Sequence, residues 1–140
     1  MASPTPTRRA RRALALAEYV ALRATIAARY RARPLDTLVR ALGRRRTRAP
    51  LPATELAEVV RQADRLISRL RVVPDTCLFR SLARFGLAAR WLGHGPAVVF
   101  RMGLPASGSG PGHAWLTLDG AAWLEPTPAE MLETFTCSLE

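Results

Sequence analysis

The sequence contains no lysine, so all 21 of its basic side chains are arginines. Such a composition is typical of GC-rich coding, which inflates arginine and alanine, and it weakens any nucleic-acid interpretation of the net charge of +10. The arginines lie between Arg8 and Arg101, whereas the chain from Met102 onward has five acidic residues and no arginine. Few aromatic residues lie among the arginines, and no recognition motif for nucleic acid is present. The composition therefore favours a protein that does not bind nucleic acid.

The chain also lacks a long uninterrupted apolar run. Its longest apolar stretch, residues 13–28, is broken by Glu18 and Arg23 and is too short to span a bilayer. The first residues are basic but are not followed by the apolar segment of a secretory signal. We therefore expect a soluble, cytoplasmic protein with no membrane span.

Cysteine and histidine are both scarce, with two of each. Neither Cys77 and Cys137 nor the two histidines have the spacing of metal ligands, so we expect no metal and no cofactor. In a cytosolic protein, a lone cysteine in good sequence context is more often catalytic or simply buried than bonded in a disulfide.

The length of 140 residues fits one domain. We expect a disordered tail at residues 1–9 and a single domain at 10–140, with a helical part at 10–72 and a cysteine-bearing helix and sheet at 73–140. The apolar periodicity predicts helices over about 10–32, 35–42 and 77–92, and a further helix that begins at residue 53 or 54 and stops before Pro74. It also predicts strands at 97–102, 113–118 and 121–124, and a short acidic helix at about 128–136. The predicted fold class is α+β: N-terminal helices, followed by a helix packed on a small antiparallel sheet.

A basic loop, residues 43–52, separates the second predicted helix from the third. Its arginines are typical of a solvated linker, and they would also suit a docking patch for an acidic partner.

Cys77 and His113 are the candidate catalytic pair. Cys77 lies in the first turn of a predicted helix, where partial positive charge and unpaired N–H groups stabilise a thiolate and can supply half of an oxyanion hole. His113 begins a strand directly after a glycine-rich loop. A helix-start cysteine with a strand-start histidine is the arrangement that a papain-like thiolate–imidazolium pair requires.

Two carboxylates, Glu125 and Asp119, could orient the imidazole. Asp119-Gly120 is a hairpin signal, so positions whose numbers sum to about 239 should face each other across the two strands. Glu125 is then within one residue of the cross-strand partner of His113, and Asp119 lies at the far end of the ladder. The geometry favours Glu125. Trp115 is expected in the sheet core or in the cleft wall, where it could contact substrate.

Three segments together resemble the transglutaminase-like cysteine leader peptidases of lasso-peptide biosynthesis, in their stand-alone form. The segments are residues 74–83 with Cys77, residues 93–101, and the His113-Ala-Trp run to residue 120, and the likeness covers about residues 55–126. It departs at Glu125, where the superfamily usually has aspartate. It also lacks a glutamine shortly before Cys77, which is a common papain-type oxyanion donor; Gln62 is the only glutamine and is not assigned that role.

The resemblance implies a papain/transglutaminase-like fold and a cysteine peptidase that removes the leader of a ribosomally made precursor peptide. It also implies a separate leader-recognition protein as partner, with an ATP-dependent lasso cyclase acting on the freed amine. Acyl transfer to an amine instead of water, on another peptide, is the alternative reaction. A basic helical binding protein without activity is the alternative from another class.

Overall fold

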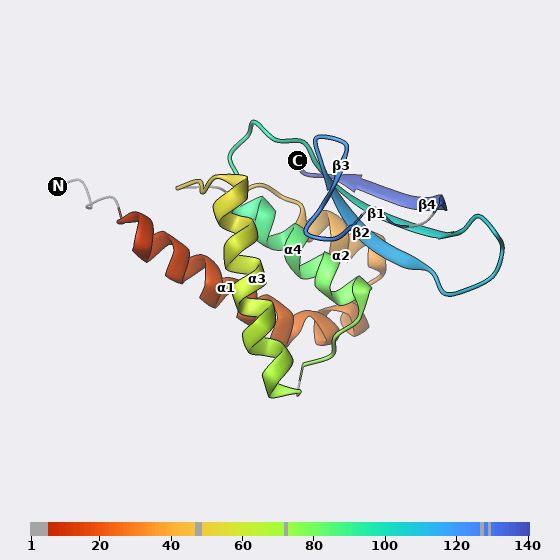
Figure 1. The fold of residues 1–140 in the computed structure, drawn as a ribbon, viewed down its shortest axis with the longest axis horizontal. Coiled ribbons are helices and arrows are strands. Elements are labelled where there is room, and N and C mark those ends of the chain that lie inside the picture. Colours follow the sequence, from red (N-terminus) through yellow and green to blue (C-terminus); the bar gives the residue numbers. More distant parts are fainter. Residues whose placement is uncertain (1–5, 47–48, 72, 127, 129) are drawn as a thin grey trace.

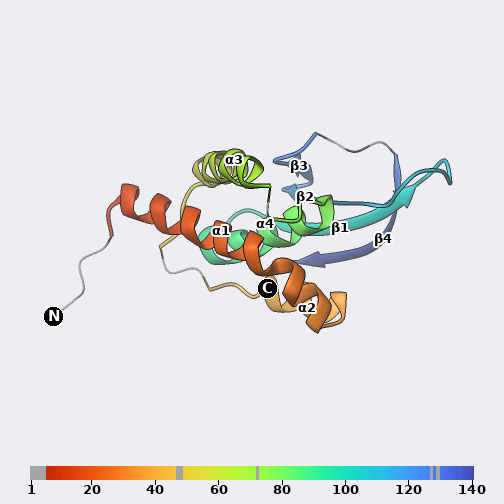
Figure 2. The same ribbon diagram turned by 90° about the horizontal axis from the view of Figure 1, so that it is seen from below.

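The computed structural model describes residues 6–46, 49–71, 73–126, 128 and 130–140. In these residues four helices precede four strands, and the sheet is antiparallel with the order β3-β2-β1-β4 (Figures 1 and 2). The predicted α+β fold is confirmed. The elements are α1 (Arg8–Ala32), α2 (Leu35–Leu42), α3 (Ala53–Leu70), α4 (Cys77–Trp91), β1 (Val98–Pro105), β2 (His113–Leu118), β3 (Ala121–Trp123) and β4 (Met131–Ser138).

Helix α1 begins at Arg8 because Thr7 caps it: the Thr7 hydroxyl accepts a hydrogen bond from the N–H of Ala10 at 3.2 Å. Part of the segment expected to be a disordered tail is therefore helical, and residues 1–5 lie outside the described residues. No helix in the described part of the chain is both long enough and apolar enough to cross a membrane.

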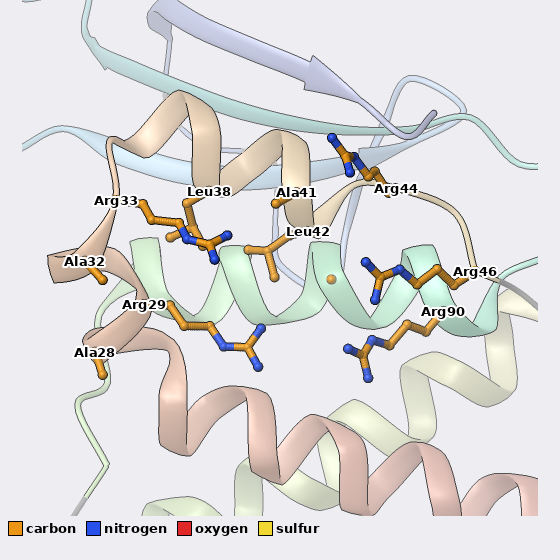
Figure 3. Close-up of a pocket in the computed structure, with 11 residues that line it drawn as sticks. Ala28, Arg29, Ala32, Arg33, Leu38, Ala41, Leu42, Arg44, Arg46 and Arg90 are labelled. Carbon is orange, nitrogen blue, oxygen red and sulfur yellow. The ribbon is translucent and has the colours of Figure 1, made fainter.

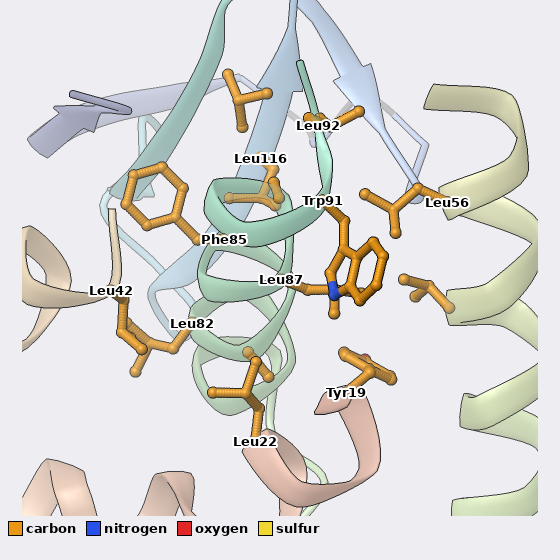
Figure 4. Packing of buried hydrophobic residues seen from close by; sticks show 14 of the residues in the cluster. Tyr19, Leu22, Leu42, Leu56, Leu82, Phe85, Leu87, Trp91, Leu92 and Leu116 are labelled. Atoms are coloured by element: carbon orange, nitrogen blue, oxygen red, sulfur yellow. The ribbon is translucent and has the colours of Figure 1, made fainter. Parts of the chain in front are cut away.

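Helix α4 lies at the centre of the molecule, with helices on one side and the sheet on the other (Figure 1). All residues from 81 to 89 are buried, and a helix that is buried on every face is expected to be surrounded by other elements. Figure 4 shows its apolar side chains meeting Leu22 from α1, Leu42 from α2, Leu56 from α3 and Leu116 from β2. The hydrophobic core thus forms around the helix that Cys77 begins.

The β2–β3 hairpin has the register that the sequence predicts. Leu116 pairs with Trp123, and Leu118 pairs with Ala121. Asp119 and Gly120 have φ values of 50° and 86°, which the left-handed region of a tight hairpin turn requires.

The prediction of an acidic helix at about residues 128–136 is wrong. Residues 131–138 form β4, which pairs antiparallel with β1. It is the edge strand on the side of the sheet opposite β3 (Figure 2). Phe135 and Cys137 are half-buried and alternate with exposed Thr134 and Thr136, so this part of the segment has the period of a strand. Its β-branched and aromatic residues fit that surface better than a helix, and its one glutamate, Glu133, is exposed and pairs with Arg101 of β1.

Gly43 lets α2 pack closely on α4. A Cβ added there would lie 2.7 Å from Cε1 and 2.9 Å from Cζ of the buried Phe85 ring. We predict that Gly43→Ala lowers the free energy of unfolding by about 1–3 kcal/mol, because a well-packed core accepts extra volume poorly. Gly95→Ala is the control, since a Cβ at Gly95 meets nothing within 4 Å. Equal urea denaturation curves for the two variants would contradict this packing.

Candidate active site

Cys77 is the first residue of α4, and the cap of the helix fixes it there. The Thr76 hydroxyl accepts a hydrogen bond from the N–H of Phe79 at 3.1 Å, and the N–H of Arg80 donates to the Thr76 carbonyl at 3.0 Å. Cys77 is a half-buried free cysteine. Its thiol therefore lies at the end of a helix where backbone N–H groups are available to an anion.

Cys77 lies on the face of α4 that packs against the start of β2. Ser81 and Arg84 follow Cys77 at intervals of four and seven residues, so all three lie on the same helix face. The buried Ser81 hydroxyl donates to the Ala114 carbonyl at 3.0 Å, and Ala114 is the neighbour of His113. The face of α4 that bears Cys77 thus packs where His113 begins its strand.

His113 pairs with Glu125. His113 Nε2 lies 3.4 Å from Glu125 Oε2, and the His113 ring stacks on Trp115 with centroids 5.9 Å apart and an interplanar angle of 11°. Both partners are largely shielded, because the His113 side chain is 28% exposed and that of Glu125 is 16% exposed. The structure therefore brings together His113 and the carboxylate that the hairpin register favours.

The backbone turns sharply just before Glu125. Strand β3 ends at Trp123, and Leu124 has a φ of 70°. A left-handed conformation is strained for a leucine, and such strain persists only where the surrounding structure holds it. The turn ends the strand ladder and redirects the chain as Glu125 comes alongside His113.

Asp119 has a structural position in the hairpin turn. Its Oδ1 accepts a hydrogen bond from the N–H of Ala97 at 2.8 Å, and its own N–H donates to the Ala97 carbonyl at 2.8 Å. It lies at the other end of β2 from His113, six residues or roughly 20 Å along the strand. Trp115 is only 6% exposed and stacks on His113, so it offers little free surface to a substrate.

Glu125 belongs to a closed ring of alternating charges, here called the charge ring. Arg84 links two of its acids: Nη1 lies 2.8 Å from Glu125 Oε1, and Nη2 lies 2.9 Å from Asp64 Oδ2. Because Oε1 of Glu125 faces Arg84, Oε2 is left for His113. The ring consists of Arg23, Asp64, Arg84, Glu125, Arg80 and Asp75.

Arg23 and Arg80 close the other half of the charge ring through Asp75. Arg23, which is 1% exposed, bonds Asp64 at 2.6 Å and Asp75 at 3.0 Å. Arg80 bonds Asp75 at 2.8 Å and approaches Glu125 at 3.6 Å. Arginine suits this arrangement because its planar fork presents several donors in fixed directions.

The ring changes the acid–base properties of its members. Burial and the charge of Asp64 raise the pKa of Tyr19 to about 12, so its hydroxyl stays protonated and donates to Asp64 at 2.8 Å. Burial disfavours the charged form of Arg84, but the hydrogen bond to Asp64 and the charge of Asp64 outweigh it and raise the Arg84 pKa. The hydrogen bond from Arg80 lowers the pKa of Asp75. These interactions favour the charged forms of Arg84 and Asp75.

The charge ring was not predicted from the sequence. Two signals pointed to it: Arg23 interrupts the apolar stripe of α1, and Arg84 follows Cys77 by seven residues on one helix face. Neither signal names its partners, which come from distant parts of the chain. The prediction of no metal was made from the spacing of the cysteines and histidines, none of which is a member of the charge ring.

A cysteine at a helix start, together with a histidine–carboxylate pair, is the combination of groups that thiol-dependent hydrolysis or acyl transfer requires. The sequence profile of the transglutaminase-like superfamily matches residues 19–139. The chain therefore belongs to the transglutaminase-like superfamily, and this membership supports an activity of the cysteine peptidase or acyltransferase type. No curated protein and no solved structure matches the chain.

We predict that Arg84→Met lowers the free energy of unfolding by about 3 kcal/mol, because it leaves two shielded carboxylates without their shared partner. Arg12→Met is the control, since Arg12 pairs with a mostly exposed Glu58 and should cost less than about 1 kcal/mol. Urea denaturation measures both. Similar losses would show that Arg84 contributes no more than a surface ion pair.

The lowered pKa of Asp75 predicts a pH dependence. A carboxylate whose pKa is lower in the folded state adds stability above its unfolded value, near 3.8, and this stability is lost as the pH falls through the folded pKa. The difference in free energy of unfolding between the wild type and Asp75→Asn should therefore shrink below pH 3.8. Denaturation at several pH values from about 6 to about 2.5 measures it, and a constant difference would contradict the pairing.

Proposed function

We propose that this protein is a cysteine peptidase that removes the leader from a ribosomally made lasso precursor peptide. In this proposal Cys77 is the nucleophile, His113 is the general base and acid, and Glu125 orients the imidazole. The observation that carries it is the contact of 3.4 Å between His113 Nε2 and Glu125 Oε2, in a transglutaminase-like domain whose α4 begins at Cys77.

The geometry of the pair supports distinct roles for the two imidazole nitrogens. With Nε2 facing Glu125, Nδ1 is free to take the proton of Cys77. Arg84 and Arg80 hold Glu125 from the other side, so the carboxylate keeps its place while the imidazole gains and loses a proton. Such a fixed third group is what a papain-like pair uses to keep its base oriented.

In the first step the Cys77 thiolate attacks the scissile carbonyl carbon and forms a C–S bond, and the carbonyl oxygen becomes an oxyanion. The N–H groups at the start of α4 are suited to stabilise it. The intermediate collapses, the C–N bond breaks, and the imidazolium of His113 gives its proton to the leaving amine. This amine is the new N-terminus of the core peptide, and the leader remains as a thioester on Cys77.

In the second step water replaces the amine. His113 removes a proton from the water, the hydroxide oxygen attacks the thioester carbonyl, and the C–S bond breaks. The leader leaves with a free carboxyl group, and the Cys77 thiolate and the His113 imidazolium are restored. The freed amine of the core is the group that an ATP-dependent lasso cyclase would join to a side-chain carboxyl.

The substrate and partners of the proposal follow from the resemblance to stand-alone leader peptidases. In this proposal a separate leader-recognition protein presents the precursor peptide to Cys77, as that resemblance implies.

Mass spectrometry tests the reaction. The protein, a leader-recognition protein and a precursor peptide should yield a leader and a core whose masses together equal that of the precursor plus one water, and Cys77→Ala should yield neither. Cys137→Ala is the matched control and should keep wild-type activity, because Cys137 lies on β4 away from His113. Unchanged cleavage by Cys77→Ala would refute the proposal. A leader carrying an added amine would instead identify the acyltransferase.

A second pair of variants tests the choice of acid. Glu125→Gln should lower kcat by roughly a hundredfold or more, because an amide orients and supports the imidazolium poorly. Asp119→Asn should change kcat by less than about threefold, since in the described residues Asp119 bonds only the backbone of Ala97. Steady-state kinetics measures both, and the reverse order of effects would assign the role to Asp119.

A further inference from the structure

A groove of about 410 Å³ lies between α1, α2 and α4, apart from the residues that the proposed catalysis uses. Its floor is apolar and consists of alanines and leucines from α1 and α2 together with Gly86. Figure 3 shows the guanidinium groups converging on the space above this floor from opposite sides. The groove, here called the arginine groove, is rimmed by Arg29, Arg33, Arg44, Arg46 and Arg90.

The charge of the arginine groove is not balanced by neighbouring acids in the described part of the chain. None of the described acidic residues lines it. Within the described residues Arg90 is the only rim arginine with an ion pair, which it makes with Glu18 at 3.6 Å. Several guanidinium groups gathered in one place repel each other, and an anion bound among them would relieve that repulsion. This contrasts with the charge ring, where every arginine has two acidic neighbours.

The rim is held in place by the backbone. The N–H of Arg46 donates to the Ala89 carbonyl at 2.9 Å, and the N–H of Arg45 donates to the Glu140 carbonyl at 2.9 Å. These hydrogen bonds join the described part of the basic loop to α4 and to the segment that follows β4. Arg48 lies outside the described residues. The described arginines of the loop are presented at fixed positions, and this favours a docking patch over a solvated linker.

The shape and chemistry of the groove select the ligand. Guanidinium groups bind carboxylates through paired hydrogen bonds, and the apolar floor would accept an apolar side chain. Single-stranded nucleic acid needs aromatic side chains on which its bases stack, and no aromatic residue lines the groove. We propose that the arginine groove binds an acidic peptide segment of a separate polypeptide, with its carboxylates on the rim and an apolar side chain on the floor.

The site would act at a distance from Cys77. Gly86 follows Cys77 by nine residues, which places it half a turn around α4 and about 14 Å along the helix axis. A peptide in the groove would therefore lie on the opposite face of α4 and would leave Cys77 open. The inference goes beyond the proposed peptidase activity and does not depend on it.

Fluorescence anisotropy tests the proposal with a labelled peptide of glutamates and aspartates around a central leucine. The groove variant carries Arg29→Glu and Arg46→Glu. The control carries Arg61→Glu and Arg69→Glu, which change the net charge equally; both arginines are exposed, and Arg69 lies in the last turn of α3 as Arg29 does in α1. We expect the groove variant to weaken binding roughly tenfold and the control to weaken it less than twofold.

Three comparisons complete the experiment. Replacing the leucine of the peptide by serine should weaken binding, Cys77→Ala should bind as the wild type does, and the groove variant should keep the wild-type rate of Cys77 alkylation by iodoacetamide. Equal losses in the two charge variants would overturn the proposal, as would tighter binding of a single-stranded DNA oligonucleotide of similar length and charge. So would self-association of the protein that competes with the peptide. Because binding is measured without cleavage, failure here is distinct from failure of the peptidase proposal.

Discussion

The charge ring is the interaction on which the arrangement of this protein depends. A guanidinium as buried as that of Arg23 is tolerated only when carboxylates surround it. The two carboxylates around Arg23 come from α3 and from the segment before α4, and the third carboxylate of the charge ring, Glu125, comes from the segment after β3 and bonds Arg84. The relative positions of the helical part, α4 and the sheet are therefore set by one electrostatic requirement, and the same requirement fixes the carboxylate that faces His113.

The ring also shows what arginine contributes beyond its abundance. GC-rich coding accounts for many arginines in a sequence, but it does not account for three that each join two acids. An ammonium group could not span two carboxylates with the fixed fork of a guanidinium. The protein thus uses arginine in two ways. In the charge ring the arginines are paired with carboxylates, whereas most of the described arginines on the rim of the arginine groove have no carboxylate partner.

The features that local chemistry controls were predictable from the sequence. The apolar periodicity indicated the helices, and the Asp119-Gly120 turn gave the register that favoured Glu125 over Asp119. The rest depends on contacts distant in the chain. Strand β4 was missed because the glutamates in residues 128–136 resemble a helix surface, whereas pairing with β1 decides its structure. The left-handed Leu124 and the partners of Arg84 could not be predicted, since only the assembled fold imposes them.

The position of Glu125 between Arg84 and His113 has an evolutionary consequence. Its two oxygens serve two different partners, and the side chain is just long enough to reach both. An aspartate at this position would be shorter by one methylene, and one of the two contacts would open. Substitution of Glu125 by aspartate would therefore require a compensating change at Arg84 or in the turn at Leu124. We expect these three positions to change together in evolution.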